Sequence, residues 1–159
     1  MVSAKQDAVN PLVKSVGVLL AILMAILVTL LITRPAETTT SFTPLSGLMN
    51  LKAMAVETMP YDVAIASPAP TFIEFYADWC TTCQGMSSTV ADLHHQYGDS
   101  INFVMLDIDD PQWASQIVDY GASGVPQFTL LDSHNSEVKT WVGKVPKPIF
   151  ANVFDQLLG

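Results

Sequence analysis

Residues 71–83 decide the fold of this 159-residue chain, and they read TFIEFYADWCTTC. The segment from Thr71 to Ala77 is rich in β-branched and aromatic residues, which favour a strand. Between Cys80 and Tyr97 the apolar residues recur at helical spacing, and Gly98 ends the predicted helix. The two cysteines of the chain, Cys80 and Cys83, therefore lie where a strand gives way to a helix.

The rest of the pattern alternates between helices and strands. Strands are expected at 101–107, 127–131 and 137–142, and helices at 48–59, 61–66, 111–120 and 146–158. Strands separated by helices run parallel, whereas the last two strands form an antiparallel hairpin around the turn at 132–136. The chain is thus expected to be an α/β protein with a central mixed sheet flanked by helices.

A long apolar segment precedes this domain. Residues 15–33 read SVGVLLAILMAILVTLLIT without a charge, and as a helix they would rise about 28 Å, close to the roughly 30 Å hydrocarbon core of a bilayer. We expect a single transmembrane helix that stays uncleaved as a signal anchor, with a cleaved signal peptide as the alternative. Lys5 and Lys14 before it, against Arg34 after it, place the tail 1–14 in the cytoplasm. Residues 34–47 then form a tether, and the domain 48–159 lies across the membrane.

Net charge and cysteine content limit the functions that the chain can have. The formal net charge is −8, and an acidic surface repels phosphate backbones, so nucleic-acid binding is set aside. With only two cysteines, a fold stapled by several disulfides is excluded. A bridge between Cys80 and Cys83 closes a very small ring and would stabilise the fold little. The pair is therefore expected to carry chemistry.

The position of the pair indicates thiol exchange. Unpaired N–H groups and the positive end of the helix dipole favour an anion at Cys80, which lowers the pKa of its thiol below the about 8.5 of a free cysteine. Cys83 lies one turn further and can attack a mixed disulfide formed at Cys80. Glu74, on the preceding strand, could accept the proton of Cys83 if it is buried beneath that thiol. The alternative is an edge-exposed Glu74 without a role.

A further motif contains a proline. Pro126 follows Gly124-Val125 and opens a predicted strand, which indicates a fixed turn. A cis bond is one interpretation, although sequence alone favours the commoner trans form.

The segment Phe75-Tyr76-Ala77-Asp78-Trp79-Cys80-x-x-Cys83, with Gly124-Val125-Pro126 about forty residues later, resembles thioredoxin over roughly residues 70–158. With the apolar segment and Pro60-Tyr61-Asp62, the chain most resembles the membrane-anchored thioredoxin-like proteins of the TxlA type. The resemblance implies a thioredoxin-like fold without the usual first strand, residues 48–67 being helical instead. The chain also departs from the thioredoxin pattern. Thr81-Thr82 lies between the cysteines, and Gln84 and Met105 lie where thioredoxins carry lysines.

The resemblance also implies the roles of individual residues. Cys80 is the nucleophile, Cys83 the resolving thiol, and Glu74 the buried acid. Trp79, Val125 and Pro126 form the substrate-binding surface, with Trp79 packed beside the cysteines and Pro126 as a cis-proline. The redox-active disulfide Cys80–Cys83 takes the place of any cofactor, and no metal is required.

The same resemblance implies the direction of electron transfer and the partners. The expected function is reduction of client disulfides, for example in apocytochromes c, in the thylakoid lumen or periplasm. Electrons would come from a membrane thiol transporter of the CcdA type. A thiol oxidase or isomerase of folding proteins is the alternative within the enzymes. The alternative of another class is a metal-binding CxxC module, which needs further ligands, and only His94, His95 and His134 are available; His94 lies about 16 Å along the helix from Cys83.

Overall fold

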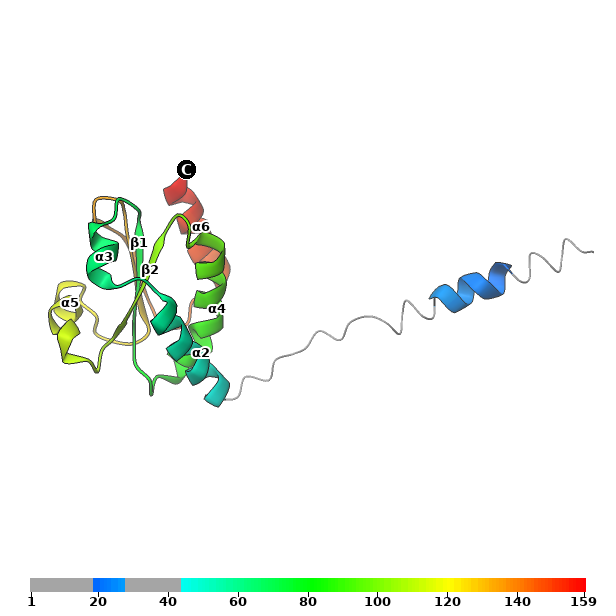
Figure 1. Ribbon diagram of the computed structural model, residues 1–159, viewed down its shortest axis with the longest axis horizontal. Coiled ribbons are helices and arrows are strands. Elements are labelled where there is room, and N and C mark those ends of the chain that lie inside the picture. The colour runs from blue at the N-terminus through cyan, green and yellow to red at the C-terminus, as the bar shows by residue number, and fades with distance from the viewer. Residues whose placement is uncertain (1–18, 28–43) are drawn as a thin grey trace, which may run out of the picture. The chain divides into compact units, whose positions relative to one another are not determined.

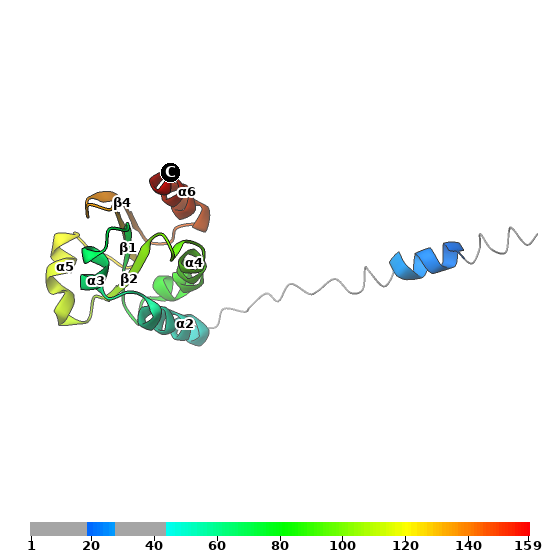
Figure 2. The ribbon, with the colours of Figure 1, turned by 45° about the horizontal axis from the view of Figure 1, so that its top comes forward.

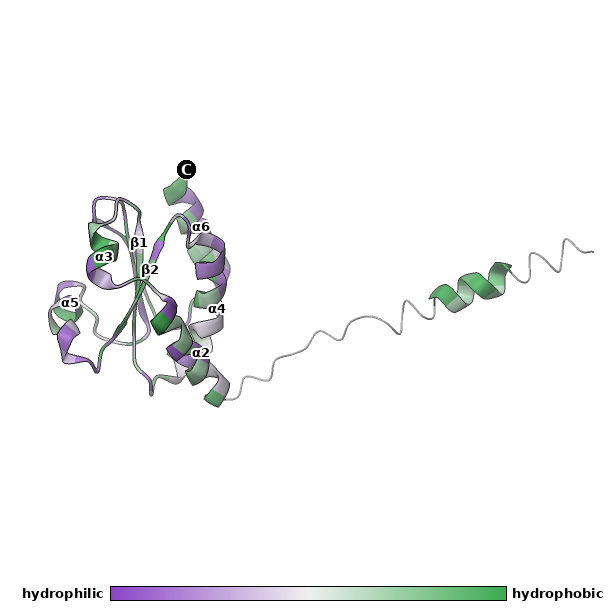
Figure 3. Ribbon diagram, in the orientation of Figure 1, coloured by the Kyte–Doolittle hydropathy of each residue, from purple (hydrophilic) through white to green (hydrophobic). Residues whose placement is uncertain are grey.

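The computed structural model describes residues 19–27 and 44–159. The chain divides into two units, residues 1–40 and 41–159, each considered by itself. In the first unit residues 19–27 form an apolar helix (Figure 3). Among the described residues, no helix is long and apolar enough to cross a membrane. The predicted cytoplasmic tail 1–14, the remainder of the predicted anchor 15–33 and residues 34–43 of the tether lie outside the described residues.

The second unit is built on a four-stranded mixed sheet in the order β2-β1-β3-β4 (Figure 1). The central strand β1 (Thr71–Tyr76) pairs in parallel with β2 (Asn102–Asp107) and antiparallel with β3 (Gln127–Leu131). The edge strand β4 (Glu137–Val142) continues β3 as a hairpin. The parallel β1–β2 pair and the β3–β4 hairpin are as the alternating pattern predicts. The parallel direction expected for β3 was wrong: β3 runs antiparallel to β1, because the long connection between β2 and β3 can return the chain to the sheet in either direction.

Helices cover both faces of the sheet. On one face lie α2 (Pro44–Glu57), α4 (Thr81–Tyr97) and α6 (Lys147–Leu158), which share a core with residues of β1, β2 and β3. On the other face α3 (Tyr61–Ala66), the short 3-10 helix η1 (Pro111–Trp113) and α5 (Ala114–Asp119) pack on a second core. Two views separate these layers (Figures 1 and 2).

The predicted helices differ from the observed ones in two places. The first helix of the domain runs from Pro44 to Glu57 rather than over 48–59, and proline is well tolerated in the first turn of a helix. The predicted helix 111–120 is divided into η1 and α5, because the Asp110 carboxylate accepts from the N–H of Gln112 and starts a tight turn that α5 then continues. Helices α2 and α3 occupy residues 44–57 and 61–66. This segment is therefore helical, as expected, in place of the usual first strand of thioredoxin.

A cluster of aromatic rings fixes β1 against the helices. The ring of Phe72 lies 5.6 Å from Phe128, stacked, and meets Phe150 and Phe154 edge-on at 5.3 and 5.1 Å. Side chains of this size in contact are among the strongest contributors to a core, since truncating one to alanine costs about 3–5 kcal/mol. The cluster anchors the strand that leads directly into the cysteines.

Two glycines on neighbouring helices give a prediction about packing. A Cβ on Gly47 of α2 would lie 3.0 Å from Cβ of Gln84 in α4, whereas a Cβ on Gly85 meets nothing within 4 Å. Gly85→Ala should therefore raise the free energy of unfolding by about 0.8 kcal/mol through helix propensity. Gly47→Ala should lower it by about 1–3 kcal/mol, because α2 and α4 are forced apart.

The measurement is urea unfolding of the full chain, followed by circular dichroism. The two variants carry the same chemical change, so each is the control of the other. Equal effects of the two substitutions would contradict the close approach of the two helices at Gly47.

Candidate active site

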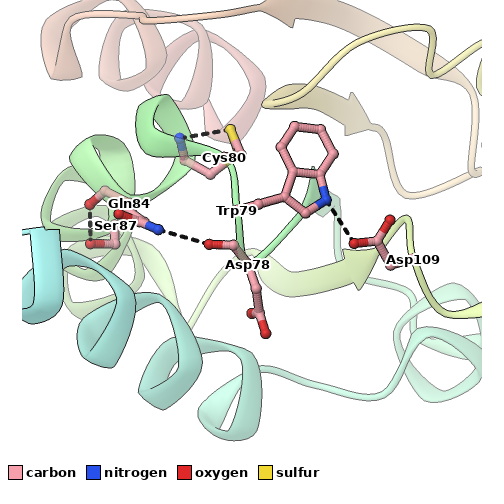
Figure 4. The surroundings of a disulfide bond; sticks show 7 residues. Asp78, Trp79, Cys80, Gln84, Ser87 and Asp109 are labelled. Carbon is pink, nitrogen blue, oxygen red and sulfur yellow. Dashed lines mark hydrogen bonds between the residues drawn. A yellow bond between two sulfur atoms is a disulfide. The ribbon is translucent and has the colours of Figure 1, made fainter.

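The two cysteines form a disulfide at the start of α4, with their Cα atoms 5.2 Å apart. Cys80 is the N-cap of this helix, and its sulfur accepts a hydrogen bond from the backbone N–H of Cys83 at 3.0 Å (Figure 4). Cys80 retains 5% of its surface exposed, whereas Cys83 is fully buried. Of the two sulfurs, that of Cys80 is therefore the one a partner can approach.

The N-cap position gives the Cys80 sulfur a specific electrostatic environment. The backbone N–H groups in the first turn of a helix lack partners within the helix, and the helix dipole is positive at that end. The same N–H of Cys83 that meets the sulfur in the disulfide would donate to a thiolate at Cys80 after reduction. A thiolate at a helix N-terminus is stabilised in this way, which makes the residue a better nucleophile at neutral pH.

Trp79 lies beside the disulfide with its ring in solvent. Its side chain is 63% exposed, and its indole N–H donates to Asp109 Oδ2 at 2.8 Å (Figure 4). Asp109 lies in the loop after β2, so the hydrogen bond fixes the ring between two loops at this end of the sheet. A large apolar surface held in one orientation is a suitable contact for a protein partner.

The Val125–Pro126 peptide bond is cis, and β3 begins at the next residue. Val125 is partly buried against the core that contains both cysteines, and Pro126 is buried. The carbonyl of Pro126 accepts from the N–H of Gly143 at 2.8 Å, which ties the loop to the end of β4. The bond is therefore in the cis form that the resemblance implies, and the trans form that sequence alone favours was wrong.

Glu74 lies in the middle of β1, opposite Met105 on β2 and Phe128 on β3. It is fully buried, and within the described part of the chain neither carboxylate oxygen has a hydrogen-bond partner. Burial in these apolar surroundings raises the pKa of Glu74 to about 8. The edge-exposed alternative was wrong, because β1 has a strand on both sides. A carboxyl group that titrates near neutral pH can take up and release a proton during catalysis.

Carboxylates gather at the end of β1 that carries the cysteines. Burial raises the pKa of Tyr76 to about 12, and the charges of Asp107, Asp78, Glu74 and Asp110 act in the same direction. These four acids come from two neighbouring strands and the loops that follow them. Acidic groups are therefore concentrated around Tyr76, at the end of β1 from which the chain continues to the disulfide.

One cation at this end was missed by the sequence reasoning. Lys52 of α2 lies with its Nζ 2.5 Å from Asp78 Oδ2, and the Gln84 side chain donates to the backbone carbonyl of Asp78 at 2.7 Å. A contact between a lysine and an aspartate from distant segments has no signature in a single sequence. Gln84, which replaces the usual lysine, thus contacts the same loop residue from α4.

The histidines lie away from the cysteines. The ring of His94 packs 5.1 Å from Phe103, near the C-terminal end of α4, and His134 lies in the turn between β3 and β4. Within residues 19–27 and 44–159, no three or more His, Cys, Asp or Glu side chains are grouped so as to hold a metal ion.

Comparison with known proteins matches residues 52–156 to the thioredoxin family model. The chain belongs to the thioredoxin family. Its fold is also that of thioredoxin O2 from Arabidopsis thaliana in the oxidised state, with a TM-score of 0.52 and 22% identity over 62% of this chain and 87% of that one. Proteins of this family act through their own redox-active disulfide without a cofactor.

Similar proteins include two longer relatives and one thioredoxin. The thiol:disulfide interchange protein TxlA of Synechococcus elongatus is 39% identical over 71% of this chain and 59% of its own length. The chloroplastic thioredoxin-like protein HCF164 of Oryza sativa subsp. japonica is 38% identical over 65% of this chain and 40% of its own length. Thioredoxin 1 of Synechococcus elongatus is 30% identical over 69% of this chain and its entire length.

The resemblance to TxlA-type proteins is thereby confirmed at the level of the family. The chain spans only about 40–59% of the length of the first two relatives. Family membership and the Cys80–Cys83 disulfide together support thiol-disulfide oxidoreductase activity.

Proposed function

We propose that the protein is a membrane-anchored thiol-disulfide oxidoreductase that reduces the disulfides of client proteins in a thylakoid lumen or periplasm. The observation that carries the proposal is the Cys80 sulfur at the N-cap of α4, which accepts the N–H of Cys83. Among the similar proteins, TxlA is named a thiol:disulfide interchange protein and HCF164 a chloroplastic thioredoxin-like protein.

The reaction starts from the reduced dithiol and proceeds in two exchanges. The Cys80 thiolate attacks one sulfur of the client disulfide, so that a Cys80–client disulfide forms and the other client sulfur leaves as a thiolate. Cys83 then attacks the Cys80 sulfur, which re-forms the Cys80–Cys83 bond and releases the second client thiolate. Two electrons pass from the protein to the client.

Glu74 serves the second exchange. Cys83 is fully buried and must lose its proton before it attacks, and Glu74 is the buried carboxyl on the adjoining strand. Because burial raises the pKa of Glu74 to about 8, its affinity for a proton is close to that of a thiol. In its ionised form Glu74 therefore accepts the proton of Cys83 as the resolving thiolate forms.

The client contacts the loops around Cys80. The exposed ring of Trp79 offers apolar surface, and Val125 with the cis-Pro126 offers backbone next to the start of β3. An extended client segment that pairs with this backbone places its disulfide beside the Cys80 sulfur.

Reduction is the direction favoured by the compartment. Disulfides persist in extracytoplasmic spaces, so a tethered reductant supplies what such a space lacks. A membrane thiol transporter of the CcdA type would re-reduce Cys80–Cys83, and the anchor 15–33 would raise the local concentration of the domain at that donor. Apocytochromes c are a suitable class of client. Oxidation or isomerisation of folding proteins is the competing direction.

The redox potential separates the two directions. We expect the full chain in neutral detergent, equilibrated with dithiothreitol and glutathione buffers, to titrate at about −270 mV, the reducing end of the thioredoxin-like range. Alkylation of free thiols followed by a gel shift measures the reduced fraction. Cys83→Ser, which cannot form the bond, is the control and should show no transition. A potential of about −120 mV would instead assign the protein as an oxidant.

A further inference from the structure

Helix α2 packs against the first turns of the helix that carries the cysteines. Gly47 lies so close to Gln84 of α4 that a Cβ there would approach the Gln84 carbonyl oxygen to 3.1 Å. In the same region Asn50 donates from Nδ2 to Ser87 Oγ at 3.1 Å. These contacts hold α2 in a fixed position relative to the start of α4 (Figure 1).

Lys52 extends from this helix to the loop before the disulfide. Its ammonium lies 2.5 Å from Asp78 Oδ2. Gln84 holds the backbone carbonyl of the same aspartate (Figure 4). The second carboxylate oxygen, Oδ1, is buried and has no hydrogen-bond partner among the residues that the structure describes. Lys52 is therefore the ionic partner that the structure gives to the Asp78 carboxylate.

Asp78 is close enough to Cys80 for its charge to matter. Two peptide units separate the residues, so their Cα atoms are at most about 7.6 Å apart, although the Asp78 carboxylate points away from the Cys80 sulfur (Figure 4). A negative charge in the loop that leads into the active-site helix disfavours a thiolate, and a cation that neutralises it weakens the effect. Since the Asp78 side chain is only partly exposed, at 40%, solvent screens this charge incompletely.

The other charges around the site make Lys52 more important. Asp107 is the last residue of β2, and Asp109 and Asp110 lie in the loop that follows it, whereas Glu74, buried in β1, mostly keeps its proton at neutral pH. On the side of β4 and α6, the exposed Lys144 follows Gly143, whose N–H holds the Pro126 carbonyl. Lys147 is instead paired with Asp92, in the C-terminal half of α4.

We propose that Lys52 is a positioning residue for thiol exchange, which neutralises and fixes Asp78 so that this carboxylate does not oppose the negative charge of the Cys80 thiolate. The inference rests on the proposed function. Lys52 acts through Asp78 and touches neither sulfur nor client. Helix α2 thereby supplies, from outside the active-site helix, a cation in a site where Gln84 and Met105 stand in place of lysines.

The test is the pH profile of alkylation. The reduced full chain in neutral detergent is treated with iodoacetamide at low ionic strength across pH 5 to 9, and mass spectrometry follows modification of Cys80. Lys52→Gln should move the midpoint of the profile up by about half a pH unit, so that the rate below the midpoint falls about threefold. The difference should shrink in 1 M KCl, because salt screens the charge of Asp78.

Three further variants separate charge from structure. Lys52→Arg should keep the wild-type profile, and Asp78→Asn combined with Lys52→Gln should restore it, since the charge to be neutralised is gone. Lys147→Gln removes the same charge from a pair remote from the disulfide and should leave the midpoint in place. Circular dichroism checks that each variant is folded.

The outcomes distinguish this inference from the proposed function. A wild-type midpoint at the ordinary value of a free thiol contradicts the proposed function and the inference together. A low wild-type midpoint that Lys52→Gln leaves unchanged contradicts only the role of Lys52. Equal shifts in Lys52→Gln and Lys147→Gln also overturn that role, because they would reflect the total charge of the domain.

Discussion

Cys83→Ser will leave client protein attached to Cys80 through a stable mixed disulfide, whereas Cys80→Ser will trap none. The sulfur of Cys80 is the more accessible of the two and lies at the helix N-terminus, so it attacks first. Cys83 is fully buried and one turn further into α4, so it can only resolve the intermediate. Without the resolving thiol the second exchange cannot occur, and the covalent complex accumulates.

Insulin serves as the disulfide probe for this experiment. Reduced full-chain variants are mixed with insulin, free thiols are blocked, and non-reducing gels with mass spectrometry identify the adduct at Cys80. Catalysed reduction of insulin should fall to the uncatalysed rate in both variants, and the double variant Cys80→Ser/Cys83→Ser gives the background. Equal trapping by the two single variants would contradict the assigned order of attack.

Local pattern was sufficient to predict the strand, the turn and the helix around the cysteines. The run from Thr71 to Tyr76 has the composition of a strand, and the helical spacing after Cys80 places that residue at the junction. The parallel β1–β2 pair and the β3–β4 hairpin followed from the length of the connections, since a short turn permits only a hairpin, but the antiparallel direction of β3 against β1 did not. These features depend on residues close together in the chain.

Features that depend on distant segments could not be predicted. The burial of Glu74 requires that β2 and β3 flank β1 on both sides, and one strand's sequence does not reveal its neighbours. The cis form of the bond before Pro126 depends on the surrounding loops, because the intrinsic preference is for trans. The Lys52–Asp78 pair joins a helix to a loop that follows another element, and nothing in the spacing indicates it.

Glu74 will make the oxidised protein less stable as the pH rises from 5 to 9. The pKa of this carboxyl is raised from 4.5 to about 8 by burial, so the folded state keeps a proton that the unfolded chain has lost. The contribution of Glu74 to the stability of the folded protein is therefore largest below pH 4.5 and is lost as the pH rises through about 8. Between pH 4.5 and about 8 the free energy of unfolding should fall by about 1.4 kcal/mol per pH unit, or about 5 kcal/mol in all.

Glu74→Gln removes this dependence while keeping the size of the side chain. Urea unfolding of the disulfide form at pH 5, 7 and 9 measures the effect, and in that form neither cysteine titrates. The variant and the wild type should be similar at pH 5, and the variant should be several kcal/mol more stable at pH 9.

The control is Glu57→Gln, an equal change at an exposed position in α2, which should retain the wild-type pH dependence. Other titrating groups contribute equally to all three proteins, so the difference between Glu74→Gln and the wild type isolates the buried carboxyl. Parallel curves for these two would mean that Glu74 ionises as easily in the folded protein as in the unfolded chain. A carboxyl of that kind would have a pKa far below that of a thiol and would be a poor acceptor for the proton of Cys83.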